Sequence, residues 1–162
     1  SLRYCRRTWH RLPIWQEVMR VKPRPKRMKC KHLILAIIGG LIYILLETLW
    51  RGYSHWTMFL LGGICFLAIG LINEVIPWEM PLWKQVLIGA CIVTALEFCT
   101  GCVVNLWLGW NVWDYSNLQG NILGQICPQY FLLWLPVSLA GIVLDDWLRY
   151  FLWGEDRPRY RV

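Results

Sequence analysis

The chain has 162 residues, of which 57% are apolar and 17% are charged, and it includes 12 Trp. A soluble domain carries about 45–50% apolar and about 25% charged residues, so this composition argues against a single domain surrounded by water. The net charge of +7 is uneven, because residues 1–31 hold eleven Lys or Arg and one Glu. A basic block ahead of apolar segments is typical of the cytoplasmic flank of a membrane protein, and it argues against a nucleic-acid partner.

Residues 1–31 form the first predicted region, a basic cytoplasmic tail. Two interpretations of residues 1–27 stay open. One is a non-native or disordered extension ahead of Met28. The other is a basic helix whose Trp9 and Trp15 lie on anionic lipid.

Four apolar segments follow, within a predicted all-α transmembrane domain over residues 32–153. A membrane span needs about 20 mostly apolar residues, and the segments that qualify are 33–50, 56–76, 86–108 and 127–152. The first could be read as a secretory signal peptide, but Glu47, Trp50 and Arg51 stand where small residues should precede cleavage. We therefore expect a retained span and a multi-pass protein.

The placement of Lys and Arg predicts the orientation of the spans. The basic tail, the link at 77–85 with Lys84, and the C-terminal tail at 154–162 share one side if there are four spans. The opposite side holds the 51–55 turn, with Arg51, and the 109–126 segment, which has no Lys or Arg. This asymmetry predicts a plasma-membrane protein with both termini in the cytoplasm.

The first and third spans show a weak internal repeat. Residues 38–49, "IGGLIYILLETL", align without gaps on residues 88–99, "IGACIVTALEFC", and the match includes Glu47 and Glu97. We therefore expect two helical hairpins related as a parallel repeat.

Ionisable groups at membrane depth are costly and by default face the interior of the bundle or a water-filled cavity. Glu47 has Arg51 four residues on, at the spacing of an ion pair along a helix. Glu97 has no base at three or four residues' distance, so its predicted partner is Arg51 or His55 from another part of the chain. Two interpretations of Glu97 stay open, namely proton or cation handling, or a protonated side chain that only holds helices together.

Near the end of the fourth span, Asp145 and Asp146 lie four and three residues before Arg149, which predicts a local structural pair.

The cysteines do not indicate a disulfide framework or a metal site. Seven Cys are scattered along the chain, and the single C-x-x-C, Cys99 and Cys102, lies within the predicted third span with no second pair at zinc-ligand spacing. Core packing is favoured for this pair, with a redox role left open. No nucleophile–base pair or metal-ligand set is apparent, so we expect no cofactor, no metal and no enzymatic activity.

The polar segment between the last two spans carries the most specific pattern of the chain. Its sequence is "WNVWDYSNLQGNILGQIC", and the residues that matter for the comparison are Trp113, Asp114, Tyr115, Ser116, Asn121, Gly124, Gln125, Ile126 and Cys127. They resemble the W-D-Y-S and N-x-x-G-[RQ]-[IV]-C motif of the membrane family named "Putative ABC-transporter type IV". The resemblance covers about residues 30–153, with departures at Gln119-Gly120 and Pro128.

The resemblance implies a small polytopic membrane protein linked to transport, with no established substrate. The chain has no G-x-x-x-x-G-K-[ST] loop, so an ATP-driven role would require a separate ATPase. Other expected partners are the lipid bilayer and either further membrane subunits or a second copy of the chain.

We expect the polar segment to form a re-entrant or interfacial elbow, since irregular backbone at that depth must be buried by protein or reached by water. Its favoured contact is an ion pair between Asp114 and Arg51. The residues predicted to line a polar path or the bundle interior are Glu47, Arg51, Glu97, Asp114, Tyr115, Asn121 and Gln125.

Two functional hypotheses follow. The chain is either a permease-like component of a transport system or a structural or regulatory membrane protein, such as an assembly partner.

Overall fold

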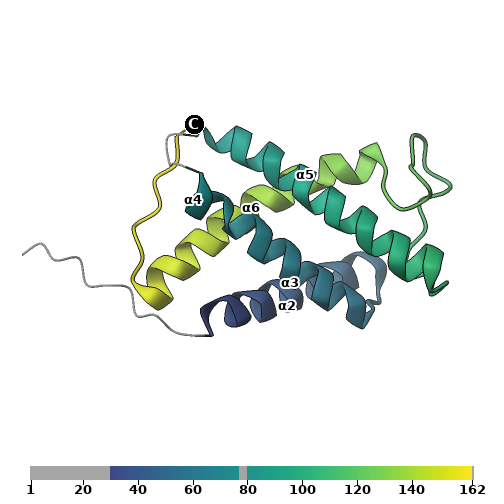
Figure 1. The fold of residues 1–162 in the computed structure, drawn as a ribbon, viewed down its shortest axis with the longest axis horizontal. Coiled ribbons are helices and arrows are strands. Elements are labelled where there is room, and N and C mark those ends of the chain that lie inside the picture. The colour runs from purple at the N-terminus through teal and green to yellow at the C-terminus, as the bar shows by residue number, and fades with distance from the viewer. Residues whose placement is uncertain (1–29, 77–79, 162) are drawn as a thin grey trace, which may run out of the picture.

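A computed structural model describes residues 30–76 and 80–161, and every regular element in those ranges is a helix (Figure 1). The predicted basic tail therefore lies outside the described residues, apart from its last two positions. The helices are α2 (Lys31–Arg51), α3 (Trp56–Gly70), α4 (Ile72–Val75), α5 (Leu82–Gly101) and α6 (Pro128–Trp153), and a π-helical segment, η1 (Cys102–Trp107), continues α5. The predicted all-α fold class is confirmed.

Four of these helical stretches are long and apolar enough to cross a membrane: Lys31–Arg51, Trp56–Val75, Leu82–Trp107 and Pro128–Trp153. The shortest has 20 residues, which at about 1.5 Å per residue covers the roughly 30 Å of hydrocarbon in a bilayer. The third helix begins at Leu82 rather than at the predicted residue 86, since Pro81 occupies its N-cap. Pro136 is accommodated within α6, which runs on to Trp153.

Consecutive long helices run in opposite directions, so the bundle has two ends. We call them the Lys31 end, which also holds Glu74 and Arg149, and the Arg51 end, which holds the turn at 52–55 and the elbow at 108–127. Ion pairs from Lys31 and Arg149 to Glu74 join α2, α4 and α6 at the first end. Arg51 reaches the carbonyl of Val112 at the second end. Residues 30 and 161 therefore lie at the same end of the bundle.

The helices pack as α2 against α3 and α5 against α6, with α3 also contacting α5 and α6 (Figure 1). Glycines allow the close approach of α2 and α3. A Cβ on Gly39 would overlap the side chain of Phe66, and one on Gly62 would overlap Tyr43. Small residues at such crossings are characteristic of membrane helices, whose association depends on close packing. The parallel relation between the two hairpins stays a prediction.

The outer surface of the bundle is strongly apolar. Along α2, Leu33, Leu41 and Leu45 are each more than half exposed, whereas Leu35 on the opposite face is fully buried. Exposed apolar stripes of this length would favour aggregation in water, but they are the surface that a bilayer requires. Lipid is therefore the solvent to which this fold is suited.

Candidate functional site

Buried polar side chains follow the interface between α5 and α6. On α5 and η1 one row of buried positions recurs every fourth residue, at Gln85, Gly89, Val93, Glu97, Gly101 and Asn105, and Ala90 and Val104 are buried beside it. The buried residues of α6 are Trp134, Ser138, Ile142, Asp145, Asp146, Arg149 and Trp153, of which Asp145, Asp146 and Arg149 contact α3 or α4. Such groups belong in the bundle interior because exposing them to lipid is unfavourable. For a charged residue the free-energy cost is on the order of 3 kcal/mol. The buried polar groups form two clusters, one toward each end, separated by a mostly apolar layer of Val93, Ile142 and their neighbours, which also holds the buried side chain of Ser138.

Glu97 is the centre of the cluster toward the Arg51 end. Its side chain is only 2% exposed, and both carboxyl oxygens accept hydrogen bonds from neutral donors. The hydroxyl of Tyr115, from the elbow, lies 3.0 Å from Oε1, and the indole Nε1 of Trp134, from α6, lies 2.8 Å from Oε2. The predicted pairing of Glu97 with Arg51 or His55 is therefore wrong. His55 instead caps the N-terminus of α3 by accepting from the amide of Thr57.

Aromatic rings surround the two donors of Glu97. Tyr43 stacks on Trp134 with ring centroids 6.1 Å apart, and Tyr130 stacks on Tyr115 at 4.3 Å. Burial and the nearby Glu97 carboxyl raise the pKa of Tyr115 well above its ordinary value, so its hydroxyl stays protonated and can donate to the carboxylate.

Asn105 and Gln125 form the outer layer of the same cluster. The Asn105 amide nitrogen lies 2.8 Å from Oε1 of Gln125, and its oxygen accepts from the amide of Val112 at 2.7 Å. The Trp113 indole donates to the backbone oxygen of Gln125 at 3.0 Å. Asn105 lies in η1, and π-helical turns inside α-helices recur at functional sites. Together these bonds fix the elbow to the end of the third span.

The structure confirms the predicted pair of Glu47 and Arg51. An Arg51 guanidinium nitrogen lies 2.7 Å from Glu47 Oε1, and Ser54 donates to the other carboxyl oxygen. Arg51 also donates to the carbonyl of Val112 at 3.3 Å. The pair thus connects the end of α2 to the elbow, but Glu97 has no contact with it among the hydrogen bonds and ion pairs of the described residues.

Asp114 and Asn121 shape the elbow and do not line the bundle interior. Asp114 is exposed and accepts from the amide and hydroxyl of Ser116, and these bonds lower the pKa of Asp114. It forms no ion pair with Arg51 within the described residues, so the predicted contact is wrong. Asn121 donates to the carbonyl of Leu118 at 2.7 Å and accepts from the amide of Gly124 at 3.0 Å, which closes the loop.

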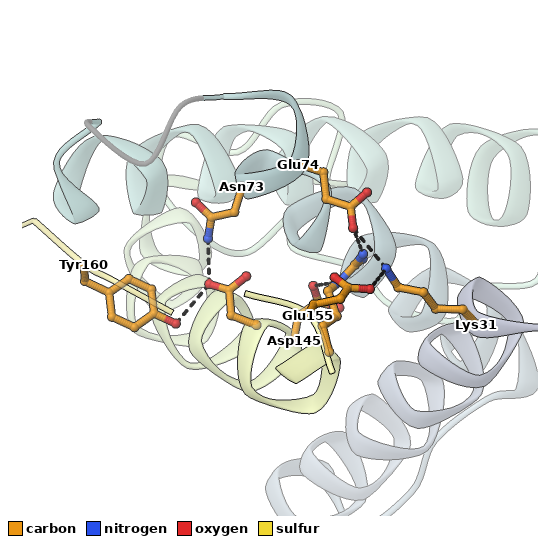
Figure 2. Close-up of polar contacts among 8 residues, drawn as sticks. Lys31, Asn73, Glu74, Asp145, Glu155 and Tyr160 are labelled. Atoms are coloured by element: carbon orange, nitrogen blue, oxygen red, sulfur yellow. Dashed lines mark hydrogen bonds and ion pairs between the residues drawn. The ribbon is translucent and has the colours of Figure 1, made fainter. Parts of the chain in front are cut away.

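The second cluster lies at the Lys31 end and is largely ionic (Figure 2). Arg149, with a side chain 3% exposed, binds Asp145 on its own helix and Glu74 on α4. Lys31 joins Glu74 at 3.1 Å and also binds Glu155. We call this set, together with Asn73, Asp146 and Tyr160, the Arg149 cluster.

The predicted local pairing near Arg149 is correct for Asp145 and wrong for Asp146. Asp146 accepts from the Asn73 amide at 2.6 Å and from the Tyr160 hydroxyl at 2.9 Å (Figure 2). The Arg149 cluster therefore holds four acids and two bases. Its signal in the sequence was Asn73 and Glu74 near the end of one span and two Asp near the end of another, but their convergence depends on helix packing.

The described residues contain no group of three or more His, Cys, Asp or Glu side chains placed to hold a metal ion. The cysteines of the C-x-x-C pair are free thiols, with Cys99 exposed on the helix surface and Cys102 partly buried. The carboxyl groups of the two clusters can bind or release protons and attract cations.

Comparison with known proteins identifies a family. The sequence model of the family described as "Putative ABC-transporter type IV" matches residues 32–152, which comprise all four candidate spans except their outermost residues. No curated protein and no solved structure matches the chain. Because the family match covers most of the sequence, the chain belongs to the "Putative ABC-transporter type IV" family of membrane proteins.

Proposed function

We propose that this protein is a permease-like component of a transport system and that it handles protons or cations through the interface between α5 and α6. The observation that carries the proposal is Glu97, a carboxyl group buried in the middle of a membrane span with two neutral donors and no base. Intramembrane ionisable residues of this kind mark ion and proton pathways in membrane proteins.

The chemistry of Glu97 suits reversible protonation. A buried carboxylate paired with Arg or Lys is held in its charged form, whereas one that meets only hydrogen-bond donors can take up a proton without breaking an ion pair. Asp146 has the same arrangement at the Lys31 end, where it meets Asn73 and Tyr160. Two acids that form no ion pair within the described residues, one in each cluster, are the feature expected of a relay.

The apolar layer between the clusters supports a closed conformation. Val93 and Ile142 are almost fully buried, and so is Ile69 of α3. Charge does not cross such a layer unless water or a polar side chain enters it. A transport cycle would therefore require α5 and α6 to separate at this level. An ATP-driven cycle would in addition require an ATPase subunit, since the sequence has no phosphate-binding loop.

Flux through reconstituted protein tests the proposal. Proteoliposomes containing a trapped pH-sensitive dye or a cation-sensitive dye should show proton or cation flux, respectively, with the native chain. They should show none with Glu97→Gln, which keeps the size and hydrogen-bonding capacity of the side chain. Asp156→Asn, an exposed carboxyl outside the spans, is the matched control and should behave as the native chain does. Native flux from a folded Glu97→Gln variant would exclude Glu97 from the pathway.

A second candidate function, a structural or assembly role, is favoured by a different observation. Each Glu97 oxygen already has a partner, so the cluster could serve only to fix the elbow on the helices. Cysteine accessibility separates the two functions. Val93→Cys, one turn from Glu97 and 5% exposed, should react with a water-borne thiol reagent if water enters the path. Val103→Cys, on the lipid-facing surface, is the control.

A further inference from the structure

The C-terminal segment 154–161, which we call the strap, crosses the Lys31 end of the bundle (Figure 1). It leaves α6 at Gly154, whose left-handed backbone (φ +67°) ends that helix. Glu155 then binds Lys31 of α2, Tyr160 donates to Asp146 of α6, and the carbonyl of Arg161 accepts from the amide of Leu82 at 2.7 Å. The strap is thus attached to three of the four long helices.

Exposure alternates along the strap with a period of two residues. Pro158 is buried and Tyr160 packs against the core, whereas Arg157, Arg159 and Arg161 are exposed. This period is that of an extended chain, in which successive side chains point to opposite faces. The inward face holds the strap to the helices, and the outward face carries a row of arginines.

The three arginines have no acidic partner among the described residues, because every ion pair in that part of the chain uses Lys31, Arg51 or Arg149. The acids of the strap do not neutralise the row. Glu155 is already bound to Lys31, and no ion pair among the described residues joins Asp156 to Arg157, Arg159 or Arg161.

The row lies where a membrane surface would be. Leu82, which the strap contacts, is the first residue of a membrane-spanning helix. Next to it, Trp83 is exposed and carries Lys84 over its ring at 5.3 Å. Exposed Trp and Lys beside the end of a span are typical of the headgroup region of a bilayer.

We propose that Arg157, Arg159 and Arg161 bind the phosphate groups of anionic phospholipids, so that the membrane surface holds the strap against the Lys31 end. The guanidinium group suits this ligand because its planar fork can donate two hydrogen bonds to one phosphate. Attraction between one basic residue and an anionic surface corresponds to roughly fivefold in affinity, so the row should contribute on the order of a hundredfold. This inference does not depend on the proposed transport function.

Hydrogen exchange of the full chain in lipid nanodiscs tests the proposal. Peptides covering the Leu82 amide and the strap should exchange more slowly in nanodiscs containing phosphatidylglycerol than in nanodiscs of phosphatidylcholine alone. The triple substitution R157Q/R159Q/R161Q should abolish this lipid dependence, and R157K/R159K/R161K, which keeps the charge, should retain most of it. The basic residues at 1–31 are the same in the native chain and both variants, so the difference between the variants reports on the row alone.

Three results would overturn the proposal. The first is equal exchange of the native chain in both lipids, and the second is an unchanged lipid dependence in the triple Gln variant. The third is that soluble glycerol phosphate, added to phosphatidylcholine nanodiscs, slows exchange as much as phosphatidylglycerol does. The last would assign the row to a soluble phosphate compound and not to the membrane. Helical content by circular dichroism and elution volume in size-exclusion chromatography should be equal for all variants, which excludes misfolding as the cause of any difference.

Discussion

The hydrogen bond from Tyr115 to Glu97 should make a measurable contribution to the stability of the bundle. Tyr115→Phe removes the donor but keeps the ring, so the stacking on Tyr130 at 4.3 Å is retained. Glu97→Met removes the acceptor with little change in volume. In the Glu97→Met background this bond is absent, so Tyr115→Phe should not lower the free energy of unfolding through its loss. The change in that free energy caused by Tyr115→Phe differs between the two backgrounds by the coupling energy of the pair.

The magnitude follows from the geometry. Hydrogen bonds between membrane helices average about 0.6 kcal/mol in such cycles, and bonds to charged groups in proteins contribute about 1.5–3 kcal/mol. The 3.0 Å distance is favourable, and Glu97 is only 2% exposed, so water cannot replace the lost donor. We therefore expect a coupling energy of about 1–2 kcal/mol.

Unfolding in mixed micelles of a mild detergent and dodecyl sulfate, followed by tryptophan fluorescence, measures the four free energies of the cycle. Tyr130→Phe is the matched control, since Tyr130 stacks on Tyr115 but makes no hydrogen bond to Glu97, and its coupling to Glu97→Met should be near zero. A Tyr115–Glu97 coupling below about 0.5 kcal/mol, the usual limit of additivity, would refute the argument that this bond fixes the elbow to the third span.

Three further predictions follow from the packing and the polar contacts. Gly70→Ala should destabilise the bundle by about 1–3 kcal/mol, measured by the same unfolding assay, because the added methyl group would overlap the carboxyl of Asp145. Arg51→Gln should cost about 1.5–3 kcal/mol, because it leaves the largely buried Glu47 carboxyl with Ser54 alone; the additional substitution Glu47→Gln should recover part of that loss. Burial and the neighbouring Asp146 carboxyl raise the pKa of Tyr160 above its ordinary 10.0, so the unfolded state releases this proton first. The free energy of unfolding should therefore be unaffected by Tyr160 below pH 10 and should fall as the pH rises beyond it, with a smaller fall in Tyr160→Phe.

The sequence predicted the spans and the local pairs because both depend on residues close together in the chain. Uninterrupted apolar runs identified the membrane helices, and the four-residue spacing identified the ion pair of Glu47 and Arg51. The same spacing identified Asp145 and Arg149 but wrongly included Asp146. One further residue along a helix turns a side chain by about 100°, and this rotation directs Asp146 to Asn73 and not to Arg149.

The partners of Glu97 could not be predicted, since they come from segments far along the chain. Tyr115 follows η1, whose π-helical turn shifts the direction in which the chain leaves the third span. The spacing of apolar residues in the sequence does not indicate such a turn. Trp134 reaches Glu97 only because α6 packs against α5. The expected pairing of Arg51 with Asp114 failed for a related reason: Arg51 is already bound to Glu47 and the carbonyl of Val112.

The two acids that lack a base, Glu97 and Asp146, are bound in the same way at opposite ends of the bundle. Each accepts one hydrogen bond from a neighbouring helix and one from a tyrosine hydroxyl in a non-helical segment. The helix donors, Trp134 and Asn73, lie on packed helices, whereas the tyrosines lie in non-helical segments that hydrogen bonds and an ion pair hold against the helices. A non-helical segment can move without breaking the backbone hydrogen bonds of a helix. The elbow and the strap are therefore the parts whose displacement uncovers a carboxyl group without separating any helices, and each acid has its own cover.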